Sequence, residues 1–176
     1  MEGLTRILRG IDNINEWTGK KFSIISIVLM LVVVYDVIMR IIGYATLWGV
    51  EFSGFLLLAL TYLAGGYALL HDAHVNVDLI YKALPLRVKA LTDSLTYFVF
   101  FIVPIILVWN GGQVAWQSLR DHTLSPSAWG PPMWPSQMLI PIGGLLIGLQ
   151  ALARWIRSMH ILLRGTEIQS SKAGNL

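Results

Sequence analysis

The sequence contains no cysteine and few charged residues. The absence of cysteine excludes disulfides, thiolate metal sites and cysteine-based redox chemistry. Charged residues make up 13% of the 176 residues and hydrophobic residues make up 55%. Ordinary soluble domains carry about 25% charged residues, and the mean hydropathy here is +0.64. This deficit of charge excludes an ordinary soluble domain and indicates an integral membrane protein.

Four apolar runs are long enough to cross a bilayer as helices, because about 20 apolar residues span the hydrocarbon core. The runs lie at about 22–43, 52–71, 93–114 and 137–156. We therefore predict an all-α integral membrane protein whose four-helix membrane domain covers residues 20–157. Residues 158–176 are predicted to form a cytoplasmic tail.

Residues 1–19 are predicted to form an amphipathic helix at the membrane surface. One face carries apolar side chains at helical spacing, namely Leu4, Ile7, Leu8, Ile11 and Ile14. Polar side chains occupy the other positions, among them Arg6, Arg9, Asp12, Asn13 and Glu16. This pattern is typical of a helix whose apolar face lies in lipid. A loose tail with accidental periodicity is the alternative.

The distribution of basic residues predicts the orientation of the spans. Eleven of the 13 Lys and Arg residues lie on the side of both termini, and Arg40 and Arg120 lie on the other. Cytoplasmic loops carry the excess of Lys and Arg in membrane proteins. Both termini are therefore predicted to be cytoplasmic. The basic residues are topology signals at span ends, so the net charge of +3 does not indicate a nucleic-acid-binding protein.

Asp36 and Arg40 are the only charged residues inside the first span. Their i,i+4 spacing, with the acid first, is the favourable orientation for a helical ion pair. Two interpretations stay open. The pair neutralises itself and reaches toward the interface, or it makes a contact between helices or subunits. Further polar and aromatic candidates for contacts with a partner lie near the two ends of the second span. They are Trp48, Glu51, His74 and Asp78.

The histidines are weak candidates for haem or metal ligands. Two axial histidines must approach one haem iron from opposite faces, and His122 is predicted to lie a membrane thickness from the other three. His71 and His160 share a side, but His71 lies at the very end of its span and His160 lies beyond the last span. A hydrated interfacial cluster fits the inner group better than a metal site does; this group is His71, Asp72, His74 and Asp78. We expect no cofactor and no metal.

Hydrolysis and independent transport are also not expected. Ser125 lies near Asp121 and His122 in the sequence, but adjacency in a loop is not triad geometry, and there is no nucleophile elbow. Carriers place binding groups near the midplane, often in internal repeats. The spans here have almost no midplane charges and no visible repeat. By elimination, the chain is expected to be a non-enzymatic accessory that packs against a larger membrane protein.

Several short motifs occur in a fixed order along the chain. They comprise Arg40, Trp48, Glu51, Gly65, the run His74-Val75-Asn76-Val77-Asp78-Leu79 and the pair Leu84-Pro85. The Pro-Met-Trp of residues 132–134 and the run Ile140-Pro141-Ile142-Gly143 follow. This combination resembles the small membrane subunit (Q, DctQ-type) of TRAP transporters, over about Lys20 to Arg157. The His71-Asp72 pair departs from the family pattern, where a more variable basic or small residue is expected.

The resemblance implies a tripartite transporter in the bacterial inner membrane. A periplasmic substrate-binding (P) protein would deliver an organic acid, and a large membrane (M) subunit would move it with sodium. The small subunit would be a non-catalytic scaffold without its own cofactor, in contact with both proteins and with membrane lipid. A redox-enzyme membrane anchor, with or without haem, and a stand-alone channel or carrier remain the alternatives.

The resemblance also suggests three contact sites. One predicted group is Asp36, Arg40 and Glu51, which would hold the first two spans together or form an outer interface with another subunit. His74 and Asp78 are predicted to form an interface on the inner side. The Pro- and Trp-rich loop between the last two spans, from Trp116 to Ser136, is predicted to be stiff and non-helical. It would form part of the docking surface for the binding protein. The residues of this surface would be Arg120, Asp121, His122, Trp129 and Trp134.

Overall fold

The structure of the protein, a computed structural model, describes residues 2–71 and 86–164. Its helices are α1 (Glu2–Phe22), α2 (Ile24–Ile41), α3 (Gly49–Leu70), α5 (Leu86–Phe100), α6 (Ile102–Arg120) and α7 (Trp134–Arg164). Four stretches are long and apolar enough to cross a membrane, namely Thr5–Ile41, Gly49–Leu70, Ser94–Arg120 and Trp134–Leu163. The predicted all-α membrane fold with four spans is therefore confirmed. The side of the membrane on which the termini lie stays a prediction.

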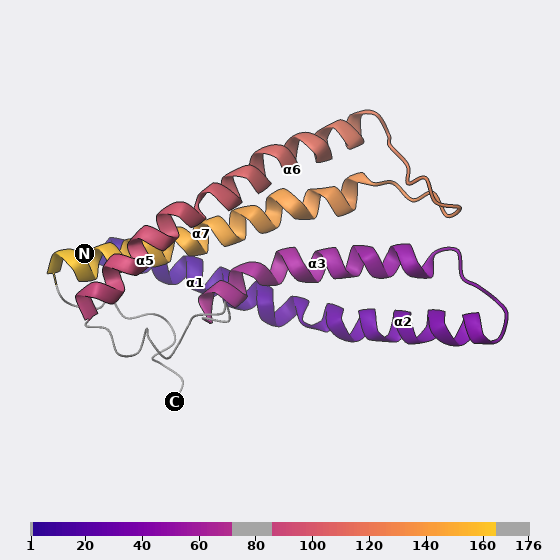
Figure 1. Ribbon diagram of the computed structural model, residues 1–176, viewed down its shortest axis with the longest axis horizontal. Helices are drawn as coiled ribbons and strands as arrows, with labels where there is room; N and C mark the ends of the chain where they lie inside the picture. Colours follow the sequence, from indigo (N-terminus) through magenta and orange to yellow (C-terminus); the bar gives the residue numbers. More distant parts are fainter. Residues whose placement is uncertain (1, 72–85, 165–176) are drawn as a thin grey trace.

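The four spanning helices form a single row (Figure 1). α6 packs against α7, α7 packs against α3, and α3 packs against α2. α2 and α6 are therefore the two edges of the row, and α3 and α7 form its centre. We call the end of the row with the connections 42–48 and 121–133 the loop end. The opposite end, where α1 and the last turns of α7 lie, is the terminal end.

Two adjacent glycines bring α7 close to both of its neighbours. A Cβ atom at Gly143 would lie 2.5 Å from the carbonyl oxygen of Tyr62 in α3. A Cβ atom at Gly144 would lie 2.9 Å from the Cβ atom of Leu107 in α6. Small residues at such positions let helix backbones approach closely in a membrane. Both glycines of α7 are thus used for packing within the chain.

The third span consists of two helices, α5 and α6, which are separated at Phe101. Pro104 follows three residues later. Its ring has no N–H and crowds the carbonyl group four residues before it, which breaks the regular hydrogen-bond ladder at this point. The backbone N–H of Ile105 still donates to the carbonyl oxygen of Phe101, at 3.3 Å. The span therefore continues past the break.

α6 extends to Arg120, beyond the predicted end of the third span near residue 114. Trp116, which we assigned to the following loop, therefore lies inside the helix. Gly111 does not end the helix because it packs against α7, where its missing side chain leaves room for Ile140. The connection to α7 is residues 121–133, which is shorter than the predicted loop.

α1 is followed directly by α2, with only Ser23 between them. α1 also contacts α3 and α7. Its Ile14 and Trp17 side chains are 52% and 61% exposed, whereas Leu8 and Asp12 are buried. Part of the polar side of this helix therefore faces protein, and not water as its pattern suggested. That α1 lies at the membrane surface stays a prediction.

Candidate partner-contact sites

A buried polar network joins α1 to α7 at the terminal end. The Asp12 carboxylate accepts hydrogen bonds from both terminal nitrogens of Arg157, at 3.2 Å (Nη1–Oδ1) and 2.6 Å (Nη2–Oδ2). Gln150 Nε2 donates to Asp12 Oδ1 at 3.1 Å, and Asn15 Nδ2 donates to Gln150 Oε1 at 2.9 Å. Asp12, Asn15 and Gln150 are buried. A buried charge is tolerated only when it is paired and hydrogen-bonded in this way.

Helical spacing explains why these four side chains meet. Gln150 and Arg157 lie seven residues apart, so they are two turns apart on one face of α7. Asp12 and Asn15 lie three residues apart on one face of α1. Gly66 on α3 leaves the space that Asn15 Oδ1 occupies. α1 is therefore held between two spans.

Further hydrogen bonds join other helices at the terminal end. His71, which follows the last residue of α3, pairs through Nε2 with Glu16 Oε2 of α1 at 2.7 Å. Arg154 of α7 donates from Nη1 to the Tyr97 hydroxyl of α5 at 3.0 Å. Its Nη2 donates to the Leu70 carbonyl oxygen at 2.9 Å, which satisfies one of the carbonyls left open at the end of α3. Helices α1, α3, α5 and α7 are thus cross-linked here.

At the loop end, Asp36 is a buried acceptor in α2. It accepts a hydrogen bond from Arg40 Nη2 at 2.7 Å and another from the Thr46 hydroxyl. Gly49, the first residue of α3, lies so close to the carboxylate that a side chain would not fit there. The Arg40 side chain is 55% exposed. Asp36 therefore joins α2 to the start of α3, while Arg40 faces outward.

A chain of aromatic side chains connects three segments of the loop end. Tyr35 of α2 stacks on Trp48 with ring centroids 6.0 Å apart. Trp48 meets Phe52 of α3 edge-on at 6.0 Å, and Phe52 meets Trp129 edge-on at 6.4 Å. Offset and edge-on pairs are the favoured aromatic geometries. Trp48 and Trp129 are thus brought together through Phe52.

The connection 121–133 is folded back on itself and anchored to α3. The Ser127 hydroxyl donates a hydrogen bond to the Glu51 carboxylate and accepts one from the Gly130 N–H at 3.1 Å. The backbone N–H of Met133 donates to the Thr123 carbonyl oxygen at 3.1 Å, which closes the base of the connection. Glu51 is therefore bonded to this connection, and its predicted part in an outer contact with another subunit stays a prediction.

The predicted docking residues lie within this connection or directly beside it. Arg120 ends α6, Asp121 and His122 follow it, and Trp134 begins α7. All five predicted docking residues are exposed, with Trp129 at 42% and Trp134 at 38%. His122 adopts a left-handed backbone conformation with φ of 48°. Positive, negative and aromatic side chains are thus exposed at the loop end, and their role in docking stays a prediction.

Two predicted contact residues, His74 and Asp78, lie outside the residues that the structure describes, as does Asp72. The network of Asp12, Asn15, Gln150 and Arg157 was not predicted. The sequence signal that could have indicated this network is the pair Gln150 and Arg157, seven positions apart near the end of the last span. Polar groups in such spans normally face protein.

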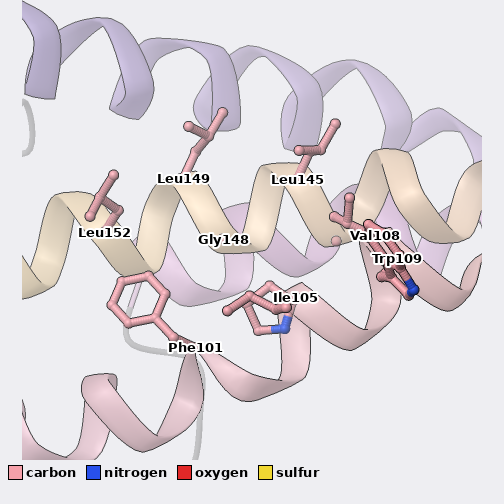
Figure 2. A pocket seen from close by; sticks show the side chains of 10 residues that line it. Phe101, Ile105, Val108, Trp109, Leu145, Gly148, Leu149 and Leu152 are labelled. Carbon is pink, nitrogen blue, oxygen red and sulfur yellow. The ribbon is translucent and has the colours of Figure 1, made fainter. Parts of the chain in front are cut away.

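An apolar groove of about 380 Å³ lies between α6 and α7 (Figure 2). Phe101, Ile105 and Trp109 line one side, and Leu149 and Leu152 line the other. The lining side chains carry no titratable group. An organic anion would lose its hydration here without compensating hydrogen bonds, so the groove does not suit such a substrate.

Comparison with known proteins identifies one family. A comparison with curated proteins gives no significant match. Residues 29–160 match the family of the DctQ component of tripartite ATP-independent periplasmic transporters. The match runs from the first half of α2 into the last turns of α7 and includes the Trp48–Trp129 contacts and the Gln150–Arg157 face. The chain therefore belongs to the DctQ family and is a multi-pass membrane protein, the small component of a tripartite ATP-independent periplasmic (TRAP) transporter.

Proposed function

We propose that this chain is a non-catalytic scaffold in a sodium-coupled TRAP transporter for organic acids. It would lie in the bacterial inner membrane with both termini in the cytoplasm. Its partners would be a large membrane subunit, which binds sodium and moves the substrate, and a periplasmic substrate-binding protein. The chain itself would hold no cofactor.

The observation that carries this proposal is the single row of spanning helices. Alternating access requires two parts that enclose a site and move against each other. In the described part of the chain, α3 and α7 pack directly on one another, and α2 and α6 pack on their outer sides. The helix backbones approach closely, as at Gly65 and Gly143, where an added Cβ atom would lie 2.7 Å from Ile147 and 2.5 Å from the carbonyl oxygen of Tyr62. Such a row supports a frame that another subunit uses, with the transport path in that subunit.

The cross-links at both ends of the row support the same role. The terminal end is held by the Asp12–Arg157 ion pair, and the loop end by the Glu51–Ser127 hydrogen bond. A scaffold must resist displacement when a neighbour moves. Buried, bidentate and cross-helix contacts provide that resistance.

Reconstitution in liposomes tests the proposal. The chain alone is expected to give no substrate or sodium flux. The chain with the large subunit and the binding protein is expected to take up an organic acid when a sodium gradient is imposed. Flux through the chain alone would contradict the scaffold role, and so would full uptake by the large subunit and binding protein without this chain. A haem absorbance band in the purified chain would favour the redox-anchor alternative.

A further inference from the structure

We propose that the outward edge of α6 receives a transmembrane helix of the large subunit, and that this helix carries hydrogen-bonding side chains. This inference rests on the proposed function and adds the surface through which the two membrane subunits meet. The row has two edges, α2 and α6, and they differ in chemistry.

The outward face of α6 carries a strip of carboxamide side chains. Asn110, Gln113 and Gln117 follow one another at spacings of three and four residues, which places them on one side of the helix. All three are exposed. The buried positions of α6, Gly111 and Ala115 among them, lie on the side that packs against α7. The strip therefore points away from the rest of the row.

The carboxamides lack partners within the part of the chain that the structure describes. None of the three side chains donates or accepts a hydrogen bond there. At 1.5 Å per residue, Gln113 lies about 10 Å and Asn110 about 15 Å from Arg120, the end of the span. These positions lie within the hydrocarbon core if Arg120 marks the membrane surface. Lipid tails offer no hydrogen bonds to the exposed carboxamides, whereas a polar helix does.

The other edge serves as an internal comparison. The exposed residues of α2 at the same spacings of four and three are Ile27, Leu31, Val34 and Ile38, with exposures of 59%, 59%, 47% and 49%. This aliphatic surface is well matched to lipid tails. The polar edge at α6, and not the apolar edge at α2, therefore requires a protein neighbour.

The charge at the end of the strip favours a different subunit over a second copy of this chain. Arg120 continues the strip three residues after Gln117 and is exposed. Two copies in one membrane have the same orientation, so a symmetric contact along the strip would place Arg120 opposite Arg120. Like charges in such a position oppose pairing. A partner helix with an acceptor or an acidic group near its outer end fits instead.

Trp109 extends the contact surface toward α7. Its side chain is 68% exposed, and it directly precedes Asn110 in the helix. It also lines the apolar groove, where Figure 2 shows it next to Val108. A helix seated on the carboxamide strip would cover this ring, and large aromatic side chains are typical anchors of protein interfaces.

Site-specific photo-crosslinking of the assembled complex tests the inference. A photoreactive residue replaces Gln113 in one variant and Val34 of α2 in the matched control, and each is co-expressed with the large subunit. The Gln113 variant is expected to form a product with the combined mass of the two subunits, several-fold more than the control. Crosslinking of Gln113 to lipid only, or to a second copy of this chain, would overturn the inference. Equal or greater yield from Val34 would also overturn it.

Removal of the carboxamides gives a second measurement. The variant Asn110→Leu/Gln113→Leu replaces both carboxamides by apolar side chains and removes their hydrogen bonds. An interhelical hydrogen bond of ~0.6 kcal/mol corresponds to about threefold in affinity, so the dissociation constant of the membrane subunits should rise about eightfold. An unchanged constant would contradict the inference. If the unmodified chain binds no large subunit, the proposed function itself fails; if the complex forms but the strip plays no part, only the inference fails.

Discussion

Replacing Asp12 by alanine tests whether the buried network fastens α1 to α7. The carboxylate is completely buried and holds Arg157 through two hydrogen bonds, while the Arg157 side chain is only 12% exposed. Removal of one partner from a buried ion pair costs about 3–5 kcal/mol, because the other charge stays buried without compensation. A change of 1 kcal/mol shifts Tm by about 2–4 °C in a chain of this length. The Tm of Asp12→Ala should therefore fall by about 6–20 °C.

A double variant separates the cost of an unpaired charge from other effects of the substitution. In Asp12→Ala/Arg157→Leu both charges are absent, and an apolar side chain fills part of the space. Replacement of a whole buried pair by apolar groups is often close to neutral. We therefore expect the double variant to be more stable than Asp12→Ala, with a coupling of at least about 1 kcal/mol.

Thermal unfolding of the purified full chain in mild detergent, followed by circular dichroism, measures these differences. Lys20→Ala is the matched control on the same helix, because Lys20 pairs with Glu16 at 2.8 Å and its side chain is 66% exposed. We expect little change in the control, since exposed pairs contribute little. A fall in Tm for Asp12→Ala no larger than for the control would refute the reasoning. A double variant as unstable as the sum of its single variants would do so as well.

Two other substitutions test the loop end and the centre of the row. Ser127→Ala removes the hydrogen bond to Glu51, and trypsin cleavage after Arg120 should become several-fold faster; unchanged cleavage would show that the connection is held by other contacts. Gly143→Ala should lower Tm, because the new Cβ atom would lie 2.5 Å from the carbonyl oxygen of Tyr62. The control Gly112→Ala, with open space around it, should instead stabilise the helix by about 1 kcal/mol. Equal shifts for the two alanine variants would contradict the close packing of α3 on α7.

The number of spans could be predicted from the sequence because it depends on local composition. A run of apolar residues long enough to cross the bilayer is visible without knowledge of its neighbours. The prediction of where the third span ends was less accurate. Glycine at position 111 weakens an isolated helix, but tertiary packing against Ile140 compensates for this in the protein, and α6 continues to Arg120.

The contacts between distant segments could not be predicted in the same way. Asp12 pairs with Arg157 across 145 positions in the sequence, and no periodicity of either segment specifies that pairing. The amphipathic pattern of residues 1–19 placed Asp12 on a solvated face, because it could not show which neighbour covers that face. Glu51 likewise bonds to Ser127 and not to the Asp36–Arg40 pair, since the fold of the connection 121–133 decides its position.

Contacts at both ends of α3 would strengthen the row in the scaffold role proposed above. At the terminal end, His71 is tied to α1 and the Leu70 carbonyl to α7. At the loop end, Glu51 and Phe52 are tied to the connection that leads into α7. α3 and α7 are therefore joined at both ends and packed closely between, whereas α2 and α6 each have one supported side. A neighbour that packed on α6 would therefore contact a helix that is backed directly by this doubly joined pair.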